Sequence, residues 1–220
     1  MKKIIKEGLQ NKNNLLVLIS LLFLILFVFI GKLFFNSLYK IDLIINTFFE
    51  NFQGSETLIF LIKILSAFSD WKFILFLSIL LIYFLSKKSK FDSKIFAFTM
   101  FFSGILILFL KNLFERQRPE SIIEIAGFSF PSGHTILGSV FYGFVVYFSW
   151  KYTKKPIKQT LMFLGSIMIF LSGFLRIFLG VHWFSDIIAG FIISFIILFI
   201  AIDIIEKPFK KIKIDNFNQN

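Results

Sequence analysis

The stretch HWFSDIIAGFIISFIILFIAIDII, residues 182–205, decides the fold of this chain. Between Asp186 and Asp203 it contains no charged residue. A hydrocarbon core about 30 Å thick is crossed by about 20 helical residues, so the stretch is predicted to be a transmembrane helix. Its first turn carries His182 and Asp186, which is unusual for a membrane segment.

Five more apolar runs of comparable length precede this one. The six predicted spans lie at about 15–35, 71–86, 93–112, 132–150, 159–178 and 182–205. The sequence therefore predicts an all-α, polytopic membrane protein with six transmembrane helices. We expect residues 1–220 to form one integral membrane domain.

Composition agrees with this class. Hydrophobic residues make up 57% of the chain, 35 residues are Phe, and the mean hydropathy is +0.82, which excludes an ordinary soluble globular domain. The net charge of +11 comes from short basic clusters and not from a continuous stripe, so no nucleic-acid partner is expected. The chain has no cysteine and two histidines, and we expect no metal and no cofactor.

Basic residues predict the orientation in the membrane. Sixteen of the 24 Lys and Arg residues lie on one side of the predicted spans: Lys2, Lys3, Lys6, Lys12, Lys87, Lys88, Lys90, Lys94, Lys151, Lys154, Lys155, Lys158, Lys207, Lys210, Lys211 and Lys213. The positive-inside rule makes this side cytoplasmic. We therefore expect a multi-pass protein of the plasma membrane with both termini in the cytoplasm.

The first span follows a basic segment, as in a signal peptide, but it has no small-residue cleavage site, so we expect it to remain as an anchor. Between spans one and two, residues 41–68 are predicted to form an outer interfacial segment. Its first part is an amphipathic helix, and Ser55 can cap a second, short apolar helix from Glu56 to about Phe68. A loosely packed apolar loop or an extra short span is the alternative for this second part.

His182 and Asp186 are four residues apart, so one helical face holds both side chains. The carboxylate can then accept a hydrogen bond from one ring nitrogen and leave the other free to attack. Arg176, six residues upstream of His182, could hold the anion under attack. Taken alone, such a pair is more often a capping or packing arrangement.

Two further motifs lie at the same predicted side of the membrane. Lys111 and Arg118, followed by Pro119, can bind phosphate oxygens through a point charge and a planar fork, or can simply snorkel at a helix end. Ser132, Gly133 and His134 open the fourth span, where free amides and a hydroxyl suit an anion; a capped helix with an interfacial His is the alternative.

Together the three motifs, Lys-x6-Arg-Pro, Pro-Ser-Gly-His and Arg-x5-His-x3-Asp, resemble those of the type 2 phosphatidic acid phosphatase superfamily. The resemblance implies that His182 is a nucleophile that becomes phosphorylated and that Asp186 supports it. It also implies that His134 protonates the leaving group. The implied phosphate-binding residues are Lys111, Arg118, Ser132, Gly133 and Arg176. Leu175 stands where the family usually has Ser, so one phosphate-binding hydroxyl is missing.

The predicted function is therefore hydrolysis of a lipid phosphomonoester or diphosphate at the outer leaflet, through a phosphohistidine and without a metal. Phosphatidic acid, phosphatidylglycerol phosphate and undecaprenyl diphosphate all remain open as substrates, and nothing indicates an oligomeric state. A lipid phosphotransferase is the nearest alternative. An anion channel or transporter, or an inactive scaffold, is the alternative outside enzymes. The roles of Glu115, Glu120 and Glu124 are left open.

Overall fold

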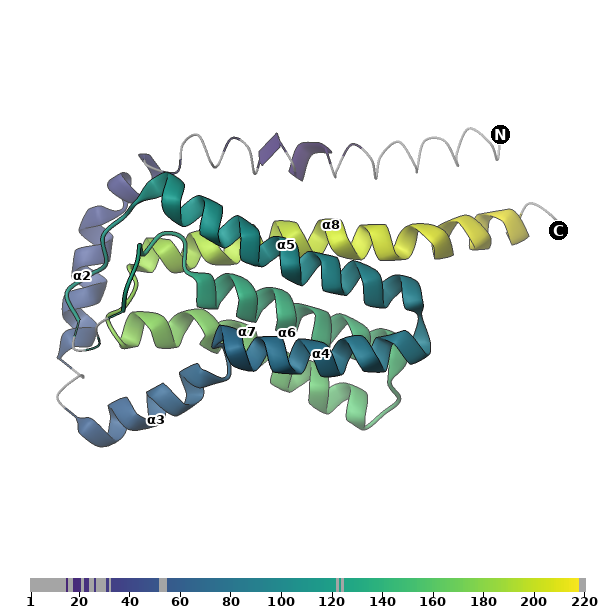
Figure 1. The fold of residues 1–220 in the computed structure, drawn as a ribbon, viewed down its shortest axis with the longest axis horizontal. Helices are drawn as coiled ribbons and strands as arrows, with labels where there is room; N and C mark the ends of the chain where they lie inside the picture. The colour runs from purple at the N-terminus through teal and green to yellow at the C-terminus, as the bar shows by residue number, and fades with distance from the viewer. Residues whose placement is uncertain are drawn as a thin grey trace.

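The computed structural model describes residues 15, 18–20, 22, 23, 26, 31, 33–51, 55–121, 123 and 125–217, with side chains to Lys207. Within these residues all regular structure is helical. The helices are α2 (Tyr39–Glu50), α3 (Glu56–Ala67), α4 (Trp71–Lys88), α5 (Lys90–Phe114), α6 (Gly133–Tyr152), α7 (Ile157–Phe178) and α8 (Phe184–Phe217). Helices α4 to α8 run side by side, and α2 crosses one end of the bundle (Figure 1).

Five predicted spans, those from residue 71 onward, coincide with helices α4 to α8. The first, at 15–35, falls largely outside the described residues. Four helical stretches of the described part are long and apolar enough to cross a membrane: Glu56–Lys88, Lys90–Phe114, Ile157–Phe178 and Phe184–Lys207. The chain is thus an all-helical membrane protein, and the count of six spans stays a prediction.

Helix α6 occupies the centre of the bundle, in contact with α4, α5, α7 and α8. Its Ile136, Val140 and Phe144 have no exposed surface. Phe144 also packs edge-on against Phe96 of α5, with ring centroids 5.2 Å apart. Because α6 is surrounded by protein, small and polar residues can replace some of the apolar side chains that lipid-facing helices require.

Helix α2 forms where an amphipathic helix is predicted, and its polar side faces the protein. Asp42 is fully buried and Asn46 is 9% exposed, whereas Ile44 and Phe48 are 69% and 56% exposed. The second predicted helix is confirmed as α3, and the Ser55 hydroxyl accepts the N–H of Leu58 at 3.4 Å. The apolar outer face of α2 fits contact with a lipid surface.

Candidate active site

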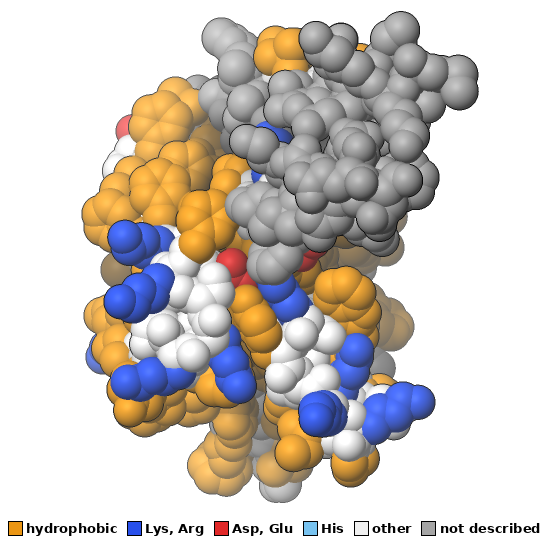
Figure 2. Space-filling model, turned by 90° about the vertical axis from the view of Figure 1, so that its right-hand side faces the viewer, with side chains coloured by type: hydrophobic (Ala, Val, Ile, Leu, Met, Phe, Trp, Pro, Cys, Tyr) orange, Lys and Arg blue, Asp and Glu red, His pale blue; other side chains and the backbone are white. Residues whose placement is uncertain are grey.

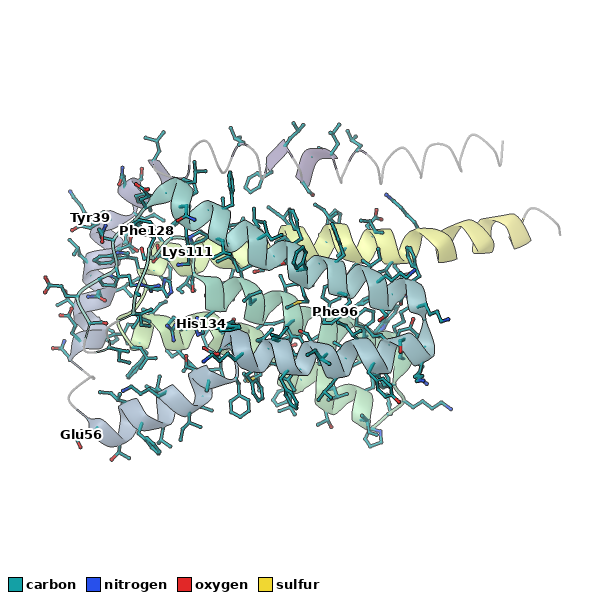
Figure 3. All side chains as sticks on the ribbon, in the orientation of Figure 1. Tyr39, Glu56, Phe96, Lys111, Phe128 and His134 are labelled. Atoms are coloured by element: carbon teal, nitrogen blue, oxygen red, sulfur yellow. The ribbon has the colours of Figure 1, made fainter. Side chains whose placement is uncertain are left out.

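The predicted site residues come together at one end of the bundle. This end holds the C-termini of α5 and α7, the N-termini of α6 and α8, and the loop at 115–132 (Figure 1). Lys111, Phe128 and His134 lie there, far from the mid-bundle Phe96 (Figure 3). The opposite end carries lysine side chains around its rim (Figure 2), including those in the last turns of α4 and α6.

His182 and Asp186 form a buried pair at the start of α8. His182 Nδ1 lies 3.2 Å from Asp186 Oδ2, and the side chains are 2% and 0% exposed. The same oxygen accepts the N–H of Trp183 at 3.0 Å. A carboxylate in the first turn of a helix is favoured by the free amides of that turn, which explains its position here.

Arg118 lies on the other side of the His182 ring. Its Nη1 is 3.2 Å from His182 Nε2 and also donates to the carbonyl of Val181 at 2.7 Å. Its Nε donates to Gly127 O at 3.0 Å and its Nη2 to Phe128 O at 3.2 Å. Since a guanidinium only donates, Nε2 must be the accepting ring nitrogen, and we assign the ring proton to Nδ1, facing Asp186.

The environment of His182 favours the neutral ring. Burial lowers its pKa well below the ordinary 6.5, and the charges of Arg118, Arg176 and Lys111 lower the pKa further, against a hydrogen bond with the backbone of Ser129. Three cationic side chains therefore act on one imidazole. A neutral ring is the form that can act as a nucleophile, through the Nε2 lone pair once Arg118 turns its N–H group away from it.

His134 faces the same end from the first turn of α6 and has an acidic neighbour that the sequence did not indicate. Its Nε2 lies 3.7 Å from Asp70 Oδ2, and the two side chains are 24% and 38% exposed. Asp70 also caps α4, because its Oδ1 accepts the N–H of Lys72 at 2.9 Å. In the sequence, Asp70 stands out only as a possible helix cap ahead of an apolar run. That position gives no indication that Asp70 lies near a functional site.

The predicted phosphate ligands differ in what they contact. Lys111 Nζ donates to Phe128 O, and Arg176 Nη1 donates to Ser66 Oγ at 3.1 Å. Arg176 is 6% exposed, and its Nε has no hydrogen-bond partner among the described residues. A buried guanidinium with an unused donor is well suited to an anionic ligand.

Ser132 acts as the N-cap of α6. Its buried hydroxyl accepts from Thr135 N at 3.4 Å and from Thr135 Oγ1 at 3.0 Å. Gly133 follows, and a Cβ there would lie 3.3 Å from Ile107. The capping interpretation of Ser132 is therefore what the hydrogen bonds support, and its contact with phosphate stays a prediction, as does that of Gly133.

Arg116 was not among the predicted site residues, yet it contacts the site directly. Its Nη1 donates to Asp186 Oδ1 at 2.6 Å and its Nη2 donates to Asp42 Oδ2 at 2.7 Å. Glu115 instead ends α5 in a left-handed conformation, and Glu124 falls outside the described residues. Only the tertiary structure brings Asp42 of α2 to this loop.

Leu175 is buried in an apolar cluster with Ile62, Leu179 and Val181. Its side chain thus packs α7 against α3 where a hydroxyl is usual in the family that the motifs resemble.

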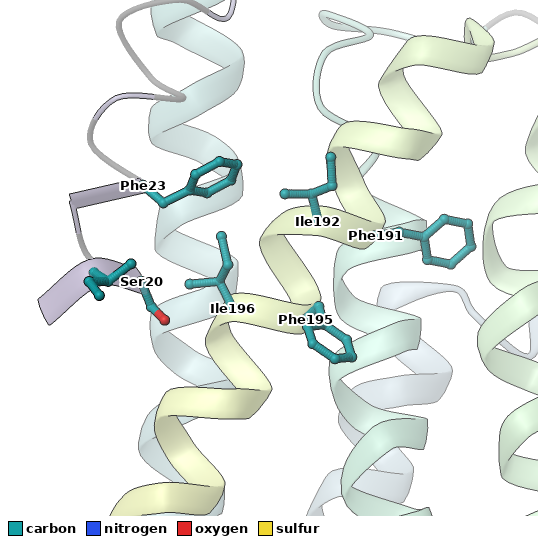
Figure 4. A pocket seen from close by; sticks show the side chains of 7 residues that line it. Ser20, Phe23, Phe191, Ile192, Phe195 and Ile196 are labelled. Carbon is teal, nitrogen blue, oxygen red and sulfur yellow. The ribbon is translucent and has the colours of Figure 1, made fainter. Parts of the chain in front are cut away.

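Two apolar pockets lie away from the site. One, of about 560 Å³, is lined by Phe23 and Ser20 near the N-terminus and by Ile192, Phe195 and Ile196 of α8 (Figure 4), and the other, of about 400 Å³, lies between α4, α6 and α7.

Known proteins resemble this chain in sequence and in fold. Phosphatidylglycerophosphatase B of Bacillus subtilis (strain 168) is 30% identical over 102 residues, which are 44% of this chain and 50% of that protein. The matched region thus spans about half the length of this relative. The crystal structure of a transmembrane PAP2-type phosphatidylglycerolphosphate phosphatase from Bacillus subtilis superposes with a TM-score of 0.74. The superposition covers 84% of this chain and 96% of the Bacillus subtilis chain. At 24% sequence identity, this likeness shows a shared fold.

The family is settled by a longer match. Residues 93–210, from α5 into α8, match the sequence profile of the PAP2 superfamily, and they contain all the predicted catalytic and phosphate-binding residues. The chain belongs to the PAP2 superfamily.

Proposed function

We propose that this protein is a membrane lipid phosphatase that transfers the phosphoryl group of its substrate to His182 and then to water. The observation that carries the proposal is the buried His182, held between Asp186 at Nδ1 and Arg118 at Nε2. Helix packing alone does not require a guanidinium beside the accepting nitrogen of a neutral imidazole. A guanidinium in that position is suited to bind the oxygens of a phosphoryl group delivered to that nitrogen.

In the first step Nε2 of His182 attacks phosphorus, and the bond from phosphorus to the lipid oxygen breaks. Arg118 already donates to Nε2, so the same guanidinium can turn its N–H groups to the phosphoryl oxygens. Asp186 stabilises the imidazolium as positive charge develops on the ring. His134 gives a proton to the departing lipid alkoxide.

In the second step His134 accepts a proton from water, which attacks the phosphohistidine and releases inorganic phosphate. Lys111, Arg118 and Arg176 supply three positive charges around the transferred group, so we propose that neither step uses a metal ion. Burial, followed by the charges of Arg176, His182, Arg118 and Lys111, lowers the pKa of His134 in the ligand-free protein, so His134 would take up its proton together with the anionic substrate.

We propose a lipid as substrate, because the site lies at the end of a helical membrane bundle, beneath α2, whose outer face is apolar and exposed. Such a face can lie at headgroup depth and form a lip for substrates arriving from the bilayer. Phosphatidylglycerol phosphate is the first substrate to test, because the relative and the solved structure that resemble this chain are both named for phosphatase activity on it.

The proposal is tested by phosphate release from the detergent-purified protein in the presence of chelator. The panel contains phosphatidylglycerol phosphate, phosphatidic acid and undecaprenyl diphosphate. We expect release from at least one lipid and none from His182→Ala, with ³²P retained on the wild-type protein after a rapid denaturing quench at alkaline pH, where phosphohistidine is stable. Undiminished release by a folded His182→Ala would rule out the proposed nucleophile.

The same assay separates hydrolysis from transfer. A phosphotransferase would consume the lipid without an equal amount of free phosphate, and the phosphoryl group would appear on an added lipid acceptor. Consumption that needs restored metal would contradict the metal-free mechanism while leaving the phosphatase assignment in place.

A further inference from the structure

Arg116 lies between two fully buried carboxylates that come from distant parts of the chain. It is 8% exposed, and Asp42 and Asp186 are 0% exposed. Its two terminal nitrogens donate one to each, at 2.7 Å to Asp42 and 2.6 Å to Asp186. Removing three charges from water is costly unless each is fully paired, so this geometry is tightly constrained.

Ser185 closes the network on the other side. Its N–H donates to Asp42 Oδ1 at 2.8 Å and its hydroxyl donates to Asp42 Oδ2 at 2.7 Å. The same hydroxyl accepts from Arg116 Nη1 at 2.7 Å. Asp42 therefore binds a free amide in the first turn of α8, one residue before Asp186, and fixes the start of that helix from outside it.

The network determines which atoms of Asp186 are available to His182. Arg116 holds Oδ1, so the carboxylate presents Oδ2 to the imidazole. Arg116 itself is fixed between aromatic rings, with its guanidinium carbon 4.5 Å from the ring centroid of Phe35 and 5.5 Å from that of Trp183.

Asp42 also affects the charge of the pair. Because it shares the guanidinium with Asp186, it reduces the neutralisation of Asp186 by Arg116. More negative charge is then left to hold the Nδ1 proton and to stabilise the imidazolium that forms during attack.

We propose that Asp42, acting through Arg116 and Ser185, is a positioning residue for the His182–Asp186 pair, and that α2 is thereby part of the catalytic apparatus. Its effect on turnover rests on the proposed function; its effect on the His182 ring does not. The outer face of α2 exposes Ile44 and Phe48, so one short helix joins the apolar surface of the protein to its nucleophile.

The test replaces Asp42 with Asn, which keeps the shape of the side chain and removes its charge. Glu50→Gln is the matched control, because it removes one carboxylate charge from an exposed position of the same helix. Ser185→Ala is a second test variant that breaks the network without a change of charge. All are compared as full-length protein in detergent.

Kinetics form the first readout. For Asp42→Asn we expect kcat to fall by about tenfold or more, with KM within about threefold of wild type, because the network acts on the nucleophile and leaves the phosphate-binding cations in place. Ser185→Ala should shift kcat in the same direction. Glu50→Gln should leave both constants unchanged. If Asp42→Asn lowers only the amount of folded protein, and the folded fraction keeps the wild-type kcat, Asp42 has a purely structural role and the proposal is overturned.

The second readout is independent of turnover. The chain has two histidines, so ¹⁵N-histidine NMR reports two rings, and a His134→Gln background leaves His182 alone. We expect wild type and Glu50→Gln to show the Nδ1–H tautomer, and Asp42→Asn to show a mixture of tautomers. An unaltered His182 spectrum in Asp42→Asn overturns the proposal even if the wild type is an active phosphatase. An altered spectrum in a protein inactive on every lipid would support the network and reject the proposed function.

Discussion

His182 has two polar neighbours, and each of them contacts a different ring nitrogen. Asp186 accepts from Nδ1, and Arg118 donates to Nε2. Each contact on its own occurs in ordinary structural roles. Together with nearly complete burial, they produce a neutral imidazole with a directed lone pair.

A titration tests this description of His182. Its pKa is lowered well below 6.5, so the folded state binds fewer protons at this residue than the unfolded state. The neutral ring should therefore persist as the pH falls through 6.5, and the neutral form that the proposed nucleophile needs should be lost only at lower pH. We expect the ¹⁵N signals of His182 in the His134→Gln variant to stay those of a neutral ring at pH 6.5.

The sign of the effect also bears on stability. A histidine with a lowered pKa destabilises the folded state progressively as the pH drops below the unfolded value, because only the unfolded chain takes up the proton freely. A His182 ring that is half protonated at or above pH 6.5 in the ligand-free protein would contradict the environment described here.

At the scale of elements, the helix packing next to the site depends on close approach. Helices α6 and α8 cross where Gly190 faces Thr135, and a Cβ at Gly190 would lie 2.9 Å from Thr135 Cβ and 3.4 Å from Ser132 O. Thr135 and Ser132 are fully buried. The contact therefore holds the N-terminus of α6, with His134, against the helix that carries Asp186.

We expect Gly190→Ala to destabilise the protein by about 1 to 3 kcal/mol, the usual cost of overpacking. Gly104→Ala is the matched control in α5, because a Cβ there would meet nothing within 4 Å. It should be neutral or stabilising by up to about 1 kcal/mol, since Ala is the better helix former. Thermal unfolding in detergent measures both, and equal stability of the two variants would contradict the close contact.

Elements were predicted well where hydrophobic periodicity is strong. Helices α4 to α8 lie at the predicted spans, and the α3 cap at Ser55 is as expected. The orientation of α2 was not predictable, because amphipathic spacing defines two faces without saying which one meets protein. Its polar face is buried because Asp42 finds Arg116 and Ser185, residues far along the chain.

At the scale of the whole molecule, the site and the lysine clusters lie at opposite ends of the helical bundle. The site occupies one end, and the other end, where α4 and α6 finish with Lys87, Lys88 and Lys151 in their last turns, carries lysine side chains around its rim (Figure 2). The positive-inside rule predicts that the lysine-rich end faces the cytoplasm and that the site faces outward. This arrangement would suit lipid phosphates of the outer leaflet.

The absence of cysteine from the chain allows a direct test of this orientation. We expect Ala126→Cys, an exposed position in the site loop, to react with a membrane-impermeant maleimide in intact cells. Lys155→Cys, exposed between α6 and α7, should react only after permeabilisation. The reverse labelling pattern would invert the orientation and place the site in the cytoplasm.

The sequence by itself was enough to predict the helices from residue 71 onward, the three motifs, and the convergence of these motifs at one end of the helical bundle. It could do so because hydrophobic length, charge bias and residue spacing are local properties of the chain. Only the tertiary structure decided how the motif residues divide their contacts. Ser132 caps α6, Leu175 packs against α3, and Asp70 joins His134.

The buried network of Asp42, Arg116 and Ser185 also belongs to the tertiary structure. Its members are up to 143 positions apart, and in the sequence each looks like an ordinary polar residue of a helix or loop. A buried charge is stable only when the folded chain brings a partner to it, so such a network has no local pattern from which it could be inferred.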